Sequence, residues 1–388
     1  MFRILKEKWL RDLLIAAALL AVTAGLVAAP GEAIEGAKEG LTLCFNVIIP
    51  SLFPFFVLSS LVVDLGLAAY LGRLLEKDMR PLFRVSGSCA VALAMGFIGG
   101  APVGARTALQ LYQQGQCTKR EAERLLAFCN NSGPAFILGV VGAGVFGSGK
   151  VGLLLYLTHA AASILVGLLF RFYGGKEPPR RSRSVRATIE TVRASAAFTG
   201  AVGKALQSTL NICAFVVFFA VLLRLLSAYG VLTGLAGLLS VFGVGEEWAR
   251  RLVAGLLELS SGVSSLSGAG VGGVSMAAFM LGWAGLSVHC QVLSFIGDSG
   301  LSVRTYIAGK LCHGLIAAAL TYGLTRLLPL SEPVSSYLAD QAESIAGLDF
   351  SSALTISLAT VFVVWSLWVL LCGAVVKKSC GKSPPHHI

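Results

Sequence analysis

The chain contains 388 residues, of which 55% are hydrophobic and 13% are charged. Because a soluble domain carries about 25% charged residues, this chain has too little charge to cover a water-facing surface, and its mean hydropathy of +0.79 agrees. The net charge of +11 lies in short clusters beside apolar spans, where cytoplasmic loops collect Lys and Arg, so membrane topology explains it without nucleic-acid binding. We therefore expect an all-α polytopic membrane protein.

Several apolar stretches are long enough to cross a bilayer core of about 30 Å as a helix of roughly 20 residues. These stretches are 12–29, 41–63, 151–173, 204–227, 303–328 and 353–376. The first follows a basic N-terminus, as a cleaved signal peptide would, but its apolar run is long for one. We expect it to remain as a transmembrane helix.

The charges of the connecting segments predict the orientation. The strongest basic cluster lies at 176–186, and both termini are basic, whereas loops 30–40 and 331–352 are acidic. Since cytoplasmic loops are rich in Lys and Arg, we expect the basic segments and both termini to be cytoplasmic. The acidic loops then lie on the outer side.

The first half contains an interrupted apolar segment, 85–116, with basic residues at both ends. Both ends are therefore expected on the cytoplasmic side, which predicts a hairpin that enters the membrane and returns. The next segment, 125–148, crosses outward and is interrupted at Asn130-Asn131-Ser132-Gly133-Pro134. The residues expected at the bend of the hairpin are Gly99, Gly100, Pro102 and Gly104.

The second half shows the same scheme in the opposite direction. Segment 249–272 carries Glu258 and several serines in an apolar setting and is expected to re-enter from outside. Segment 274–300 crosses inward, with a break expected near Gly297-Asp298-Ser299-Gly300.

Sequence matches between the halves occur in the same order. Asn46 matches Asn211, the stretch 128–133 matches 295–300, and Leu157-Thr158-His159 matches Leu311-Cys312-His313. Together with the opposite orientations deduced from charge, this order predicts two inverted repeats with re-entrant hairpins and broken helices.

Such a pattern has a physical purpose. An unpaired backbone N–H or C=O in lipid costs several kcal/mol, so broken helices at membrane depth must line a cavity or lie buried in protein. Secondary transporters bind their substrates where such breaks meet. We therefore expect a carrier of a small solute, coupled to a proton or cation, and no enzyme.

Two motifs carry a resemblance to a known family: GFIGGAPVGART at 96–107 and NNSGP at 130–134. Through these motifs the chain resembles the YlbJ family of sporulation integral membrane proteins, also called SpoVV. The resemblance covers nearly the whole chain. That family belongs with proteins that carry the nucleoside-recognition, or Gate, domain. The Gate domain in turn is similar to part of the concentrative nucleoside transporters.

The resemblance implies a place in the outer forespore membrane and the movement of dipicolinic acid from the mother cell toward the forespore. A nucleoside or other neutral-solute carrier and a non-transporting sporulation scaffold are the alternatives.

The chain is expected to divide into five regions. They are an N-terminal helix with an outer loop at 1–40, a first Gate-like repeat at 41–173, a basic cytoplasmic linker at 174–203, a second inverted Gate-like repeat at 204–328, and an outer acidic loop, last helix and basic tail at 329–388.

Arg106 is the main candidate for binding an anion, because its planar guanidinium suits a carboxylate and dipicolinate carries two. The alternative places Arg106 at the cytoplasmic mouth, where it reaches the headgroups. Asn130, Asn131 and Ser132 offer polar groups beside the first break, although an ordinary kink would explain them too.

Glu258 and Asp298, with Ser299 beside the latter, lie in apolar segments of the second half. Their carboxyl groups could bind a coupling proton or cation, or pair with a buried cation; alternatively, Glu258 lies at the outer surface. His159 and His313 are candidates for a proton relay, although a lone His more often makes one hydrogen bond between helices. Lys310 is expected to reach the headgroups from a helix end.

The sequence predicts no cofactor and no metal site. The nine cysteines are scattered, with no C-x-x-C pair. A P-loop-like run at 144–150 lacks the Ser or Thr that would hold magnesium, and a G-x-G-x-x-G run at 268–273 lacks its strand–turn–helix context.

Overall fold

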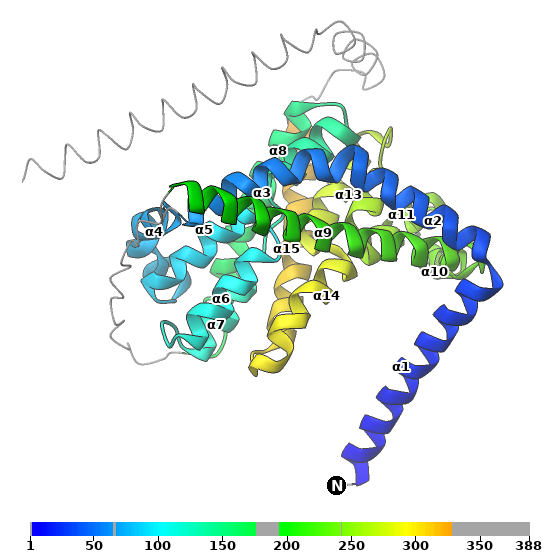
Figure 1. Cartoon of the computed structure of the whole chain (residues 1–388), viewed down its shortest axis with the longest axis horizontal. Coiled ribbons are helices and arrows are strands. Elements are labelled where there is room, and N and C mark those ends of the chain that lie inside the picture. The colour runs from blue at the N-terminus through cyan, green and yellow to red at the C-terminus, as the bar shows by residue number, and fades with distance from the viewer. Residues whose placement is uncertain (1, 65–66, 176–193, 242, 328–388) are drawn as a thin grey trace, which may run out of the picture. The chain divides into compact units, whose positions relative to one another are not determined.

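A computed structural model describes residues 2–64, 67–175, 194–241 and 243–327 (Figure 1). These residues are almost entirely helical and contain no strand. The transmembrane helix expected at 353–376, the acidic loop expected at 331–352 and most of the basic linker lie outside them.

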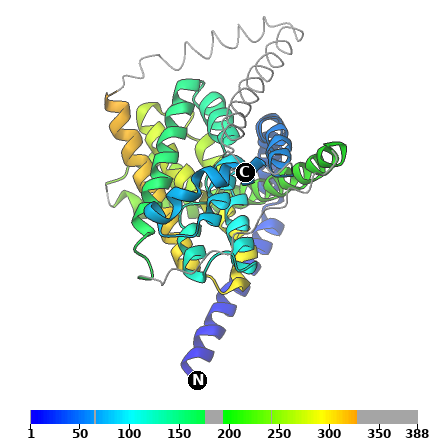
Figure 2. The same cartoon turned by 90° about the vertical axis from the view of Figure 1, so that its left-hand side faces the viewer.

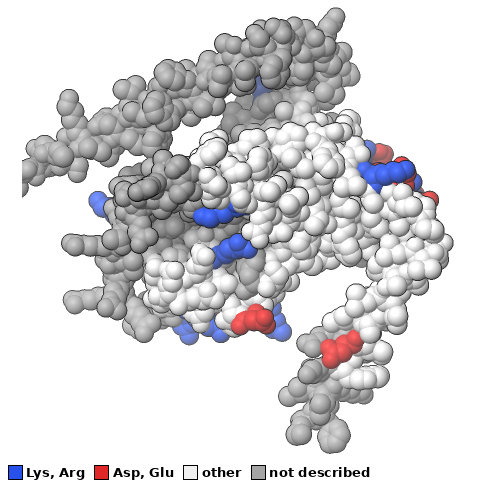
Figure 3. Space-filling model, in the orientation of Figure 1, with Lys and Arg blue, Asp and Glu red and all other residues white. Residues whose placement is uncertain are grey.

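The long apolar stretches form helices. Those long and apolar enough to span a membrane are α8 (Gly149–Phe170), α9 (Ala194–Ala228), α13 (Gly270–Trp283) together with α14 (Gly285–Ile296), and α15 (Val303–Leu327). This confirms the helices expected at 151–173, 204–227 and 303–328. Figure 3 shows that charged side chains cover little of the described surface on the face it displays, as a lipid-facing protein requires.

The N-terminal part differs from the prediction. Helix α1 (Phe2–Ala28) bends by 99° into α2 (Pro30–Leu43), which continues through the π-helical η1 (Cys44–Ile48) into α3 (Ile49–Asp64). The acidic loop expected at 30–40 is wrong, because this segment is α2 and packs along α9 (Figure 1).

Packing and charge explain why this segment is helical. Gly36 and Gly40 face α9 so closely that an added Cβ would lie 2.9 Å from the Cα atoms of Val221 and Val217. Arg224 of α9 pairs with Glu32 at 2.7 Å and Glu39 at 3.1 Å. The acidic residues therefore bind a neighbouring helix instead of marking a loop.

The predicted first hairpin is confirmed. Helix α4 (Leu67–Phe83) leads through the short η2 (Gly87–Cys89) to α5 (Ala90–Gly99), and α6 (Val103–Gln113) returns beside α5. Gly100 has φ +69°, in the left-handed region that favours glycine. A Cβ at either Gly96 or Gly104 would collide with the carbonyl oxygen of Cys129, so these glycines bring the hairpin onto the next segment.

The predicted first break is also confirmed. After α7 (Lys119–Leu126) regular helix is lost until Pro134, and the chain continues as the π-helical η3 (Ala135–Val145) before α8. Thr118 and Glu121 cap the start of α7 reciprocally. Arg124 anchors the helix: its guanidinium donates to the carbonyl oxygens of Arg84 at 2.7 Å and Tyr173 at 2.9 Å.

The second half has a hairpin at the predicted place. After α10 (Val231–Ser240), helix α11 (Glu246–Leu257) turns at Glu258 into α12 (Leu259–Ser264). An added Cβ on Gly262 would collide with Gly255, so the two arms run side by side as in the first hairpin.

The second break, however, lies earlier than predicted. It separates α13 from α14 at Ala284 and Gly285, both with φ +77°. The expected break at 297–300 is instead a 3-10 turn, η4 (Gly297–Ser299), between α14 and α15. The break at Ala284 could not be predicted from the sequence, because a positive φ is uncommon for a non-glycine residue. Gly300, with φ +72°, lies at an ordinary helix end instead.

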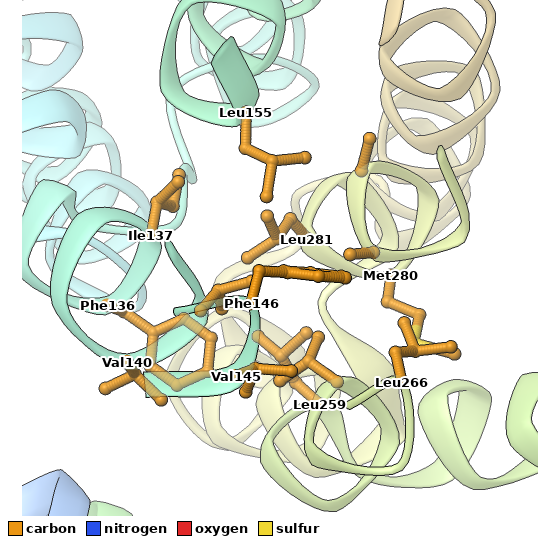
Figure 4. Packing of buried hydrophobic residues seen from close by; sticks show 14 of the residues in the cluster. Phe136, Ile137, Val140, Val145, Phe146, Leu155, Leu259, Leu266, Met280 and Leu281 are labelled. Atoms are coloured by element: carbon orange, nitrogen blue, oxygen red, sulfur yellow. The ribbon is translucent and has the colours of Figure 1, made fainter. Parts of the chain in front are cut away.

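The order of hairpin, broken helix and long helix therefore occurs twice. The first set is α5–α6, α7–η3 and α8, and the second is α11–α12, α13–α14 and α15. Helices α8 and α15 pack against each other (Figures 1 and 2). Figure 4 shows one core between the halves, where Phe136, Ile137 and Leu155 meet Leu259 and Leu281.

The hairpin packing leads to a stability prediction. Replacing Gly96 with Ala should lower the free energy of unfolding by about 1–3 kcal/mol, because the added methyl must displace backbone. Thermal unfolding in detergent measures this as a lower Tm. Gly200→Ala is the control, since nothing lies within 4 Å of a Cβ on that α9 residue; equal Tm values for both variants would contradict the predicted packing.

Candidate functional site

A pocket lies where the bends of the two hairpins and the first break meet. The space in it that admits the centre of a water-sized sphere measures about 70 Å³, and the whole hollow, counted together with open solvent, measures about 650 Å³. Its polar lining residues come from the break, the second hairpin and α14, and they are Ser132, Glu258, Ser260, Ser287 and Gln291. Its other walls include the glycines of the first hairpin and the aromatic residues Phe56, Phe136 and Phe215.

Close backbone contacts bring these parts together. An added Cβ on Gly100 of the first hairpin would lie 3.0 Å from the backbone nitrogen of Gly133 in the first break. Likewise, an added Cβ on Gly285 of the second break would lie 2.9 Å from the backbone nitrogen of Leu259. Each hairpin bend therefore packs on the break of its own half, which places both at the pocket.

Glu258 forms the bend of the second hairpin. It is buried, with only 2% of its surface exposed, and it lines the pocket. Its carboxylate accepts hydrogen bonds from the backbone N–H groups of Ser260 at 2.9 Å and Ser261 at 2.6 Å. Glu258 thus caps α12 while bringing a carboxyl group to the pocket, so the outer-surface alternative is wrong.

Ser132 ties the first break to two helices. Its backbone N–H donates to Nε2 of His159 on α8 at 3.1 Å, and its hydroxyl donates to the carbonyl oxygen of Leu281 on α13 at 3.1 Å. The neighbouring Asn131 is fully buried, and both polar atoms of its side chain have no hydrogen-bond partner among the described residues. Buried groups of this kind are rare, and the Asn131 amide is free to bond to water, an ion or a solute.

A second polar network lies behind the pocket. Lys310 of α15 is buried, and its Nζ donates to the carbonyl oxygen of Asn130 at 2.8 Å. The Asn130 side chain donates to the hydroxyl of Tyr306 at 3.4 Å, and that hydroxyl lies 3.0 Å from Nδ1 of His289 on α14. The expectation that Lys310 reaches the headgroups is wrong.

This network could have been partly predicted from the sequence. Tyr306, Lys310 and His313 are spaced by four and three residues, which puts them on one face of α15. No sequence signal, however, indicates that this face meets the first break.

The two histidines of the repeats come together. The rings of His159 and His313 have centroids 4.2 Å apart, and Nε2 of His313 lies 3.0 Å from the carbonyl oxygen of His159. Both residues are buried. The His159 ring bonds to the first break and the His313 ring bonds to α8, and the relay stays a hypothesis.

Arg106 and Asp298 are not brought to the pocket. Arg106 is exposed on α6, and Asp298 is exposed in η4, where Ser299 bonds to the carbonyl oxygen of Ile296 at 2.6 Å. None of these residues lines the pocket. Of the two alternatives for Arg106, the exposed position agrees with the second, because the hairpin turns its other face, including Gly104 and Ala105, toward the protein.

No group of three or more metal-binding side chains occurs in the part of the chain that the structure describes. The pocket is lined by hydroxyl and amide groups and one carboxyl group, and a buried lysine lies behind it. Such a site can bind a small polar solute by hydrogen bonding and by contact with aromatic rings.

Comparison with protein families gives a match at residues 45–149 to the Gate family, described as nucleoside recognition. The sporulation integral membrane protein YlbJ of Bacillus subtilis (strain 168) is 33% identical over 332 residues, which cover 80% of this chain and 81% of that protein.

The fold is similar to that of CNTnw, a concentrative nucleoside transporter. A variant of CNTnw in an intermediate state has a TM-score of 0.56 at 15% identity, covering 82% of this chain and 87% of the other. CNTnw in an inward-facing, substrate-bound state has a TM-score of 0.53 at 16% identity, covering 81% and 86%. The chain thus has a polytopic all-α fold like that of the concentrative nucleoside transporters.

The cap at Glu258 leads to a prediction for the second hairpin. Glu258→Ala removes the acceptor of two N–H groups and should cost about 0.5–2 kcal/mol. Hydrogen–deuterium exchange should then become faster at 259–264. Glu246→Ala is the control, because Glu246 is exposed and pairs only on the surface with Arg250; unchanged exchange in Glu258→Ala would show that the carboxylate does not hold the bend.

Proposed function

Because this chain belongs to the family of the sporulation integral membrane protein YlbJ, we propose that it carries a small organic solute across a membrane of a spore-forming cell. The observation that supports this most directly is the convergence of both hairpin bends and the first break on one pocket. Broken helices at membrane depth are stable only around a cavity or within protein. A scaffold without a transported solute would have no need for this arrangement.

The pocket suggests how a solute is held. Ser132, Ser287 and Gln291 offer hydrogen bonds, and Phe56 and Phe136 offer flat apolar surfaces. A planar ring with polar substituents fits this combination. Access alternates when one repeat rocks against the other, since each hairpin is packed on the break of its own half and moves with it.

Dipicolinate is our first candidate for the solute. It is a planar ring with two carboxylates, and the proposal rests on the family resemblance. Its carboxylates would accept hydrogen bonds from the side chains of Ser132, Ser287 and Gln291, which line the pocket. The Asn130-Asn131-Ser132 segment supplies neighbouring polar groups.

A neutral solute such as a nucleoside is the second candidate, and Glu258 favours it. Glu258 is the charged residue among those that line the pocket in the described part of the chain. A carboxylate there would repel a dianion and would accept hydrogen bonds from ribose hydroxyls or a base. The charge of the transported solute therefore separates the two candidates.

Transport into proteoliposomes tests the proposal. Purified protein should exchange labelled dipicolinate, or labelled uridine if the second candidate is correct, with saturable kinetics. Gln291→Ala should raise KM about 3–10-fold, because it removes about one hydrogen bond of 0.5–1.5 kcal/mol. Gln110→Ala is the matched control, since Gln110 is exposed on α6 and does not line the pocket.

Arg106→Gln separates the pocket from the anion site expected from the sequence. Since Arg106 is exposed and does not line the pocket, this variant should keep a KM within about twofold of the wild type, well below the change for one lost hydrogen bond. Loss of dipicolinate exchange in Arg106→Gln alone would assign the anion site to Arg106. Absence of exchange of either solute by folded protein would favour the scaffold.

A further inference from the structure

Lys310 is an unusual residue for its surroundings. Only 1% of its surface is exposed, although lysine is almost never fully buried unless it is paired. Its ammonium donates to a neutral acceptor, the carbonyl oxygen of Asn130, at 2.8 Å. No carboxylate of the described residues forms an ion pair with it. Burying a charge without a countercharge costs free energy, so the burial of Lys310 points to a functional role.

The acceptor of Lys310 belongs to the first helix break. Breaking a helix leaves backbone carbonyl groups without partners, and in secondary transporters such unwound carbonyls coordinate the coupling cation. Here one of these carbonyls binds the ammonium of the chain's own lysine. The ammonium of Lys310 cannot leave the site as a bound metal cation would, but it can release its proton and take up another.

The groups that face Lys310 from the surrounding helices are uncharged or basic. They are Cys129 in the break, His159 on α8, His289 on α14, and Tyr306 and His313 on α15 itself. None is a carboxylic acid. Because like charges repel strongly in a buried setting, a proton on Lys310 disfavours a second proton on any of the three histidines.

On the basis of the proposed function, we infer that Lys310 is the proton-binding residue that couples solute movement to a proton gradient. A proton from the acidic side binds Nζ, and the resulting ammonium holds the Asn130 carbonyl oxygen. Release of that proton on the other side leaves a neutral amine, whose weaker hydrogen bond loosens the break. Ser132, two residues further on, lines the pocket and transmits the change to the solute.

The test separates binding of the solute from coupling. In proteoliposomes, counterflow of labelled dipicolinate or uridine without any gradient reports the solute site, and accumulation under an imposed pH gradient reports coupling. Lys310→Gln should keep counterflow within about twofold and should lose pH-driven accumulation at least about tenfold. Lys150→Gln is the control, because Lys150 is an exposed lysine in the first turn of α8. This variant should keep both counterflow and pH-driven accumulation at the level of the wild type.

Lys310→Arg and a dye inside the vesicles provide a second test. Arginine keeps the charge but cannot release its proton, so this variant should also lose accumulation while retaining counterflow. In wild-type vesicles without an imposed gradient, solute added outside should change the internal pH.

Two outcomes would overturn the assignment to Lys310 while leaving the carrier proposal intact: pH-driven accumulation by Lys310→Gln, or accumulation in the wild type that follows a sodium gradient and moves no proton. Absence of counterflow in the wild type would overturn the carrier proposal itself, and the coupling role with it.

Discussion

A helix that breaks inside a membrane leaves backbone N–H and C=O groups with no water to satisfy them, and most of this structure is arranged around that cost. At the first break, Ser163 donates to the carbonyl oxygen of Phe128 at 2.8 Å, and Lys310 donates to that of Asn130. His159 accepts from the N–H of Ser132. Helices α8 and α15 thus provide the side chains that make the break possible.

The second break is satisfied in a different way. The N–H of Ala284 still donates to Met280 at 2.7 Å, and Gly285 lets the backbone of the second hairpin approach directly. Few side chains are required, so this break is compact and largely apolar. The two halves therefore share their order of elements but not their chemistry: the first break holds the polar network, and the second hairpin contributes the carboxyl group of Glu258.

Glycine makes these contacts possible because it has no Cβ. The arms of both hairpins, and the contact of each bend with its break, depend on backbone segments that lie too close together for an ordinary side-chain contact. The same constraint places Gly282 of α13 against Gly314 of α15. The pocket exists because these backbones meet at one place, so its shape depends on glycine positions, while its polarity depends on a few side chains.

The sequence by itself determined the class of fold, the long helices, both hairpins and the first break, because these depend on local apolar length, glycine and charge. It also singled out Asn131, Ser132, Glu258 and the pair His159 and His313. It did not reveal the break at Ala284, the helix at 30–43 or the burial of Lys310, and it left two positions open for Arg106. Those features depend on which helices pack against each other. Lys310 is buried because the neighbouring first break supplies a carbonyl oxygen to its ammonium. The acidic segment at 30–40 packs as a helix because Arg224 of α9 pairs with its glutamates. Such pairings join residues up to about 190 positions apart, and only the tertiary structure decides them.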